Sequence, residues 1–541
     1  MTQICFALGA TLLLFPFAIF ALDCLTLAVG GSIAAWQAWV GLVISCGLCF
    51  QQNSNRKQAL IVLAIALGVI GLSLWVSGSI YDFSWDGQNY HQEAILQLSA
   101  GWNPFYRYLD QSLDHSIWLN HYAKASWMIQ SSLYQMTQHL ETAKAINWIL
   151  LVASFCLTVA ALRETIPLPK GWIIAIASLL ALNPVVIVQL SSFTIDGLLA
   201  SLLLILGVLL YWIGSGGTFM PLFWLAAASA ILLINLKFTS LVYAIIFIFG
   251  LLVWLFFRDR KVFYQASIGF LFCLFIGVAG AGFNPYITNI LKQGNPFYPL
   301  RGNENVDIIA PQIPKNFIGL NPIEKLLFSV FAESDDARNT TAQLKIPFSV
   351  KLREIGEVSS ARVGGFGVLF SGAVCLSLIV VCFRKWKPFQ LTTVALGTIL
   401  ASTLINPEAW WARYAPQVWF FMPMAIAPGW IVQKPALNRK VLRFSSYALA
   451  LVLSINCASI VAPEIFQSIR GAITVNQQIN KLKQSGITQV SVQYNLFRGN
   501  RTRFLEHGIT WTEVNRNQKL PCKNPTQFYR SRTLFCPISK V

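Results

Sequence analysis

The side chains best suited to chemistry lie in residues 81–94, a polar segment that begins where an apolar run of membrane-spanning length, 59–80, ends. The candidate functional residues in this segment are Asp82, Asp86, Tyr90, His91 and Glu93. A carboxylate held at a membrane surface can take a proton from a hydroxyl or an amine, or can bind a metal ion. The position therefore suits a reaction on a substrate that is anchored in lipid.

A helix is predicted directly after Asp86. Tyr90, Ala94 and Leu98 fall on one face at helical spacing, and Gly101 supplies a stop. Asp86 then precedes the first turn, where aspartate is also a common helix cap. Two interpretations of Asp86 follow: a general base or metal ligand, and a purely structural cap.

The neighbouring polar residues also have two interpretations each. Asp82 and Glu93 are candidates for a second carboxylate, and Asp82 could equally be structural. His91 follows Tyr90 on the predicted helix, where it could support the acid or make an ordinary hydrogen bond at the membrane interface.

Cations that could bind a phosphate come from much later in the chain. Arg413 and Tyr414 follow the pair Trp410–Trp411, and Lys237 stands alone between two apolar runs. The planar guanidinium fork binds phosphate oxygens in pairs, although an arginine in this position can also extend to lipid headgroups. We expect Arg413, with Tyr414 and Lys237, to contact a phosphate, and Trp410 and Trp411 to shape the cavity.

A third candidate region contains Asn295 and Tyr298, within a tract that has two Asn-Pro steps. These two residues could shape a cavity, or they could belong to a structural turn set by the prolines.

Long apolar runs must position these residues. Of 541 residues, 55% are hydrophobic and only 11% are charged, and many windows reach the roughly 20 residues that cross a bilayer. The sequence predicts an all-α polytopic membrane protein with about thirteen spans. The predicted spans are 4–22, 31–50, 59–80, 145–162, 171–190, 197–213, 219–235, 238–257, 262–283, 363–383, 388–406, 416–432 and 444–462.

The distribution of Lys and Arg predicts the orientation, because short basic loops stay in the cytoplasm. The basic clusters fall on one side of the thirteen-span arrangement: Arg56/Lys57, Arg163/Lys170, Arg258/Arg260/Lys261, Arg384/Lys385/Lys387 and Lys434/Arg439/Lys440/Arg443. Segments 81–144, 284–362 and 463–541 are then exoplasmic. We therefore predict a membrane domain at 1–462, with the first two segments as its large loops, and a separate tail at 463–541.

The tail alternates helix-like and strand-like stretches, which predicts a small α/β domain. Cys522 and Cys536 lie in this polar tail, whereas the other cysteines lie in or beside apolar runs. If the tail faces an oxidising compartment, these two cysteines are the candidates for a disulfide.

The net charge of +18 is explained by this topology, since the cytoplasmic loops and the tail are basic. We find no basic-aromatic motif of the kind that binds nucleic acid, and no nucleic-acid partner is expected. No glycine-rich phosphate loop or zinc-binding motif is present either, which argues against a nucleotide-driven pump.

The motif Asp86-Gly-Gln-Asn-Tyr90, followed by Ala94, Leu98, Gly101 and Pro104-Phe-Tyr106, resembles the first exoplasmic loop of integral-membrane GT-C glycosyltransferases. The resemblance is greatest to protein O-mannosyltransferases and lipid A aminoarabinose transferases. Arg413-Tyr414 with Pro416 and Pro423 resembles the late Arg-Tyr-x-x-Pro pattern of the same group, and Gly294-Asn-Pro-Phe-Tyr-Pro299 resembles a tract between them.

This resemblance implies a GT-C-like fold, a polyprenyl-phosphate sugar donor, and a first-loop carboxylate base at the position of Asp86. Gly87 departs from the Asp-Glu pair that is frequent in the family, which leaves Asp82 or Glu93 for a second acid. Some members use a divalent metal, so Mg²⁺ or Mn²⁺ is left open here. The predicted function is transfer of a sugar to a glycolipid, saccharide or protein acceptor, with Arg413 binding the lipid phosphate.

Two other functions are consistent with the same features. An O-antigen ligase or polymerase also handles polyprenyl-linked saccharides beside a large exoplasmic loop, but would carry its catalytic Arg and His in a late loop. A non-enzymatic transporter or flippase for lipid-linked saccharides would be expected to show charged or glycine-broken spans at mid-membrane. The predicted location is a bacterial inner membrane, with the site and the C-terminus in the periplasm.

Overall fold

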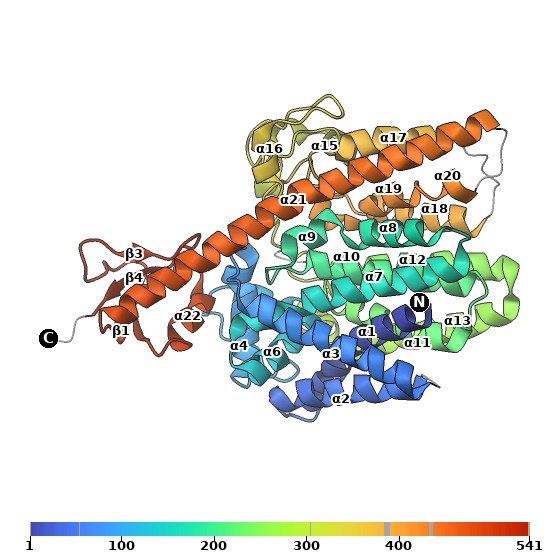
Figure 1. The fold of residues 1–541 in the computed structure, drawn as a ribbon. Coiled ribbons are helices and arrows are strands. Elements are labelled where there is room, and N and C mark those ends of the chain that lie inside the picture. Colours follow the sequence, from blue (N-terminus) through green and yellow to red (C-terminus); the bar gives the residue numbers. More distant parts are fainter. Residues whose placement is uncertain (1, 53–54, 303–304, 384–389, 432–435, 539–541) are drawn as a thin grey trace.

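The computed structural model describes residues 2–52, 55–302, 305–383, 390–431 and 436–538. The described chain is mostly helical and ends in a small sheet. Figure 1 shows a bundle of long helices running in one direction, with the sheet projecting beyond one end of the bundle.

Within the described residues, seven helices are long and apolar enough to cross a membrane. They are α1 (Thr2–Ala28), α3 (Arg56–Gly78), α7 (Ala145–Thr165), α10 (Asp196–Gly214), α12 (Phe238–Arg258), α13 (Arg260–Phe275) and α21 (Ala436–Gln484). α7 is continuous with the preceding turn from Leu140, and α13 reaches spanning length together with the following turn, as Arg260–Gly280. α1, α7 and α10 are mostly buried inside the bundle, whereas only 28% of the α3 window and 22% of the α13 window are buried. An apolar exterior of this kind matches a lipid environment.

Shorter apolar helices lie among the long ones: α2 (Ala35–Gln52), α8 (Lys170–Ala181), α11 (Phe219–Ile234), α17 (Phe370–Phe383) and α18 (Leu391–Leu404). The predicted span 416–432 is not one continuous helix in its described part. It consists of η8 (Pro416–Phe420), α19 (Phe421–Met424) and α20 (Pro428–Ile431), each of which contains a proline. A proline lacks the N–H that a continuous helix needs at its interior positions. The total of about thirteen spans stays a prediction.

The segments predicted to be exoplasmic gather at one end of the bundle. Figure 1 shows α4 (Gln92–Ser99), α6 (Ala125–Thr137), α9 (Pro184–Gln189), α15 (Pro322–Val330) and α16 (Leu352–Glu357) at the end nearer the sheet. The α7–α8 and α12–α13 connections lie at the opposite end. The basic clusters at those two connections therefore lie far from the sheet. Arg384, Lys385, Lys387 and Lys434 lie outside the described residues, as does the side chain of Arg439.

The first segment folds as short helices over the end of the bundle. They are η1, a π-helical turn (Gly87–His91), α4 (Gln92–Ser99), α5 (Ser116–His121), α6 (Ala125–Thr137) and η2 (Leu140–Lys144). α4 ends at Ser99, and Gly101 follows at φ +91°, which agrees with the predicted stop. α9 (Pro184–Gln189) lies between α8 and α10 at the same end of the bundle.

The second segment is largely irregular. It includes α14 (Thr288–Gln293), α15 (Pro322–Val330) and α16 (Leu352–Glu357), with short helical turns η3 (Ile276–Gly280), η4 (Phe283–Ile287), η5 (Ala310–Gln312) and η6 (Lys315–Phe317) at its start and between them. Asn321 and Glu324 form a capping box at the start of α15. Phe317, Val363 and Trp410 form part of a separate small hydrophobic core beneath these helices.

α21 crosses the expected boundary between the membrane domain and the tail without interruption, because Pro463 is accommodated inside the helix. The tail continues with η9 (Arg498–Asn500), α22 (Arg501–Leu505) and a sheet of β1 (Gln489–Gln493), β2 (Thr510–Glu513), β3 (Thr526–Gln527) and β4 (Leu534–Pro537). The strand order is β2-β1-β4-β3, with β1 and β2 parallel and the other pairs antiparallel.

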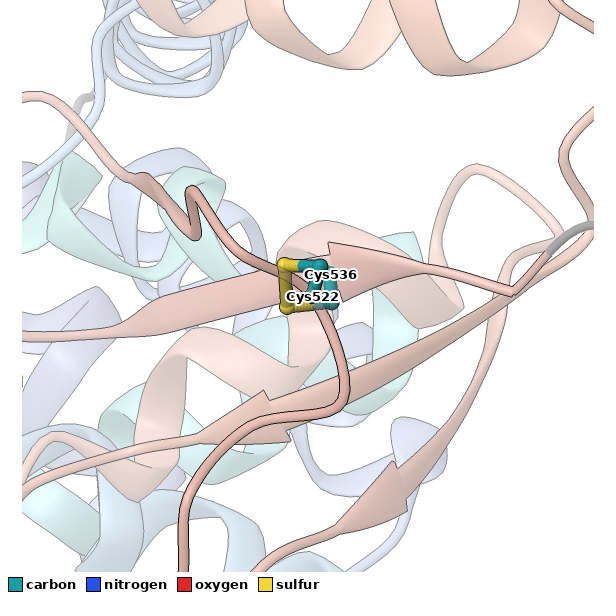
Figure 2. Close-up of a disulfide and its surroundings, with 2 residues drawn as sticks. All are labelled: Cys522 and Cys536. Atoms are coloured by element: carbon teal, nitrogen blue, oxygen red, sulfur yellow. A yellow bond between two sulfur atoms is a disulfide. The ribbon is translucent and has the colours of Figure 1, made fainter.

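The C-terminal end of α21 packs on this sheet. Val475 and Ile479 share a hydrophobic core with Val490, Phe504 and Phe535. Cys522 and Cys536 form a disulfide that ties the loop before β3 to β4 (Figure 2). The long helix therefore links the tail directly to the membrane bundle.

Candidate functional site

A cavity of about 760 Å³ lies where the loops, the tail and the ends of the membrane helices meet. Its walls come from residues 81–91, 184–195, 236–239, 358–365, 411–414, one face of α21 and the tail residues Arg530 and Arg532. Asp86, Arg413, Tyr414 and Lys237 all line it. The structure thus brings the principal sequence-predicted residues together from three distant parts of the chain.

Four charged side chains form a continuous chain at this cavity. Arg413 donates from Nη2 to Asp86 Oδ2 and from Nε to Asp196 Oδ2, each at 2.7 Å. Lys237 Nζ donates to the other oxygen of Asp196, at 2.6 Å. Asp196 is fully buried, whereas 22% of the Asp86 side chain and 26% of the Arg413 side chain are exposed to solvent. The buried acid anchors both cations, and the accessible acid faces the cavity.

Local structure explains how each group reaches this position. Asp86 precedes η1 with helical backbone angles, and its side chain makes no capping hydrogen bond. Asp196 is the first residue of α10, and Lys237 lies in the tight connection between α11 and α12. Arg413 lies in η7 (Ala412–Tyr414), just before the proline-rich segment. Asp86 is therefore not acting as a helix cap, and its carboxylate is committed to the site.

Aromatic side chains surround the cations. Lys237 Nζ lies 4.3 Å from the centre of the Tyr414 ring, and the Arg413 guanidinium lies 5.4 Å from the Trp411 ring. Burial alone would lower the pKa of Arg413, but the Asp196 and Asp86 carboxylates raise it well above its ordinary value. The guanidinium therefore stays charged in this enclosed setting, where it can attract an anion strongly.

Asp82 also lines the cavity but is bound to the protein around it. Its carboxylate accepts hydrogen bonds from Ser84 N at 2.8 Å, Ser84 Oγ at 3.0 Å and Phe193 N at 3.2 Å. Burial raises the pKa of Asp82 to about 6, although the nearby Lys144 opposes the shift. These bonds fix the loop in place, which agrees with the structural interpretation of Asp82.

Gly87 takes the place of the second acid that the GT-C resemblance leads us to expect, and it does so for a steric reason. A Cβ atom on Gly87 would lie 1.6 Å from Asp82 Oδ2 and 2.5 Å from Ser84 Oγ. Any larger residue at 87 would therefore collide with the Asp82 carboxylate. Asp82 occupies the space that a side chain at position 87 would otherwise take.

Tyr90 and His91 line the cavity behind Asp86. Trp127 Nε1 donates a hydrogen bond of 2.6 Å to His91 Nδ1, so that nitrogen is an acceptor. Burial lowers the pKa of His91 to about 4, which keeps the ring neutral near neutral pH. His91 therefore makes the ordinary hydrogen bond that was one of its two interpretations.

Glu93 does not line the cavity. Its carboxylate is bound by Arg501 of the tail, with one bond of 3.1 Å from Nη2, and by Gln97 at 2.7 Å. Burial alone would raise the pKa of Glu93, but Arg501 lowers it. The geometry makes Glu93 a contact between the first loop and the tail.

Three residues proposed to shape the cavity lie away from its wall. Asn295 accepts a hydrogen bond from Phe297 N at 2.9 Å within its own turn, and the Tyr298 ring packs against His121. Trp410 is buried behind Trp411, stacks on it, and donates to Glu408. Of these residues and Trp411, only Trp411 is among the described lining residues.

Asp196 is the main functional residue that the sequence reasoning missed. It is a single acid at the start of an apolar run, and the predicted span began one residue later. An isolated acid at a span boundary is itself a signal for a functional site. Arginines on the outer part of the cavity were missed as well: Arg338, Arg362, Arg530 and Arg532.

The residues present do not fit a metal site. No group of three His, Cys, Asp or Glu side chains converges within the ranges that the structure describes. Arg413 already bridges the Asp86 and Asp196 carboxylates.

Comparison with protein-family models gives no match to this chain, and comparison with curated proteins gives none either.

Proposed function

We propose that this protein is a membrane glycosyltransferase of GT-C type, which moves a hexosyl or pentosyl group from a polyprenyl-phosphate donor to an acceptor at the exoplasmic surface. The observation that carries the proposal is the direct contact between Asp86 and Arg413 in a cavity at the end of the membrane helices. A base and an anion-binding cation are the two groups that this transfer requires.

Asp86 is assigned as the general base. Arg413 bonds to Asp86 Oδ2, so Oδ1 is the oxygen directed to the acceptor. The acceptor hydroxyl or amine gives its proton to this carboxylate as its oxygen or nitrogen bonds to the anomeric carbon. The bond between that carbon and the phosphate oxygen breaks, and its electron pair leaves with the polyprenyl phosphate.

Arg413 and Lys237 are assigned to the leaving phosphate, with Tyr414 between them. Both cations are held by the buried Asp196, which fixes their position before the donor arrives. Preorganised charge of this kind is worth more in a partly enclosed site than in water. Arg413 can bond to phosphate through Nη1 while Nε and Nη2 keep their carboxylate partners.

The proposal includes the finer topology. The seven long and five shorter apolar helices, together with the proline-broken segment 416–431 as the twelfth crossing in chain order, make up the proposed thirteen. The tail and the cavity face the periplasm of a bacterial inner membrane. The Cys522–Cys536 disulfide supports this orientation, because disulfides persist in oxidising compartments.

The acceptor is a glycolipid, a saccharide or a protein, and membrane lipids surround the site in every case. A transporter of lipid-linked saccharides is the second candidate. The observation in its favour is that Lys237 and Arg413 are each already paired with a carboxylate. Networks that exchange ion pairs during transport have the same feature.

A transfer assay separates the two candidates. Purified protein in liposomes would receive a synthetic polyprenyl phosphate carrying a radiolabelled sugar, together with a membrane glycolipid fraction. An enzyme releases the label from its polyprenyl carrier and forms a new labelled product. A transporter leaves the label on its carrier and moves it between leaflets, and that result would overturn the proposed transfer.

A further inference from the structure

A surface of the second exoplasmic segment exposes apolar side chains outside any predicted span. We name it the 344–352 surface; its members are Leu344, Ile346, Phe348, Val350 and Leu352. Ile346 is 79% exposed and Leu352 is 88% exposed. Lys345, between Leu344 and Ile346, points inward and pairs with the buried Glu354 at 2.7 Å, so these two apolar neighbours face outward.

The centre of this surface is a turn whose tip is apolar. Ser349 N donates to Ile346 O at 3.0 Å, so Pro347 and Phe348 occupy the two central positions. Phe348 has φ +70°, a conformation that usually requires Gly or Asn at this position of a turn. A bulky aromatic residue is therefore held at the tip despite its conformational cost.

The tip is connected to a membrane helix. The Phe348 ring lies against Gly372 in the first turn of α17, where a Cβ atom would come within 2.5 Å of it. Leu344 forms an antiparallel bridge with Ala332, just after α15. α15 itself exposes Ile323 and Leu327, one turn apart. Figure 1 shows α15 next to the start of α17 at the flank of the bundle, with α16 farther toward the sheet.

The charges at the edge of this surface complement a lipid headgroup layer. Lys351 and Arg353 are 59% and 61% exposed and share one carboxylate, Glu333. The two cations therefore carry more charge than their partner neutralises. Exposed apolar side chains flanked by cations are typical of segments that lie in the interface of an anionic bilayer.

We propose that the 344–352 surface is an interfacial membrane anchor, which inserts Ile346, Phe348 and Leu352 among phospholipids beside α17. The inference is independent of the proposed function. It is carried by the apolar turn, its contact with α17 and the flanking cations. The anchor holds the second exoplasmic segment, including Arg362 of the cavity wall, at the level of the headgroups.

Photo-crosslinking tests this inference in the full-length protein. p-Benzoylphenylalanine would replace Ile346 or Leu352, with the protein in nanodiscs of phosphatidylethanolamine and phosphatidylglycerol. Position 75, a tryptophan of α3 that is 70% exposed, is the positive control, and Leu505 of the tail, 56% exposed, is the matched negative control. Phospholipid adducts would be identified by mass spectrometry after irradiation.

The expected result is a phospholipid adduct at positions 346, 352 and 75, at least tenfold more abundant than at 505. The inference is overturned if 346 and 352 give no more adduct than 505 while 75 is labelled. It is also overturned if they crosslink mainly to a second copy of the chain. An Ile346→Asp/Leu352→Asp variant supplies a second measurement, since it should lower the Tm in nanodiscs and leave it unchanged in detergent.

Discussion

Arg413 Nη2 lies 2.7 Å from Asp86 Oδ2, although 327 positions separate the two residues in the chain. The same guanidinium reaches Asp196 through Nε, so one arginine joins a loop acid to an acid at the start of a membrane helix. This bridge assembles the candidate site.

Replacement of Arg413 by lysine should not preserve activity. The ammonium group is a compact point charge and cannot bridge two carboxylates as the guanidinium fork does. We expect Arg413→Lys and Arg413→Ala both to lower kcat/KM for sugar transfer by roughly 100-fold or more. Initial rates of sugar transfer measure this loss. The matched control is Arg516→Lys, because Arg516 forms an exposed ion pair. A wild-type rate in Arg413→Lys would show that the bridge is not needed.

Loss of Asp196 should destabilise the protein as well as the site. Asp196→Asn removes the fully buried carboxylate that holds Lys237 and Arg413. Breaking a buried ion pair from one side costs roughly 3–5 kcal/mol. Thermal unfolding in nanodiscs should therefore show a clear drop in Tm. Asp114→Asn, in an exposed pair, should cost less than about 1 kcal/mol, and equal effects of the two substitutions would contradict the anchoring role.

The contact between the first loop and the tail should weaken in alkali. The Glu506 hydrogen bond raises the pKa of His139 from 6.5 to about 9, against the effect of burial, and His139 Nε2 also donates to Gly78 O at 2.8 Å. A raised pKa means that the stabilisation is complete below about 6.5 and is lost as the pH rises through about 9.

The size of this effect is limited, because 33% of the His139 side chain is exposed and solvent screens the pair, so we expect about 1 kcal/mol or less. Unfolding of the tail should be followed by thermal melts across this pH range. His139→Gln should flatten the pH dependence, and an unchanged slope in that variant would assign the dependence to another group.

The disulfide should stabilise the tail on its own. Cys522 and Cys536 are 14 positions apart, and closing a loop of about 15 residues stabilises a fold by about 3 kcal/mol. Reduction should make residues after α21 sensitive to protease while the membrane helices stay protected. The Cys522→Ser/Cys536→Ser variant should show the same sensitivity without reductant, and an equally resistant variant would argue against this role.

The local features of the fold could be predicted from the sequence because they depend on short patterns. Apolar length indicated the membrane helices, and Gly101 indicated the end of α4. The positions of prolines were less informative, because local backbone preference and long-range packing compete at these residues. Pro463 lies inside the continuous helix α21, whereas prolines do divide the segment after Arg413.

The site was predictable only in part for a related reason. Asp86 and Arg413 belong to recognisable short motifs, but nothing local shows that Asp196 pairs with Arg413, which lies 217 positions further along the chain. Glu93 has the chemistry and the spacing expected of a second acid at the site, yet its partner Arg501 comes from the tail. Such pairings are set by tertiary packing, and the spacing of residues in the sequence does not reveal them.

The most direct test of the central claim is the rate of sugar transfer from a polyprenyl-phosphate donor by Asp86→Asn, compared with Asp110→Asn. Asn keeps the shape of Asp86 but cannot accept the proton, so we expect a loss of roughly 100-fold or more with an unchanged Tm. Asp110 lies in the same loop outside the cavity wall, and its substitution should leave the rate unchanged. Near-normal transfer by Asp86→Asn at equal protein levels would contradict the assignment of Asp86 as the base.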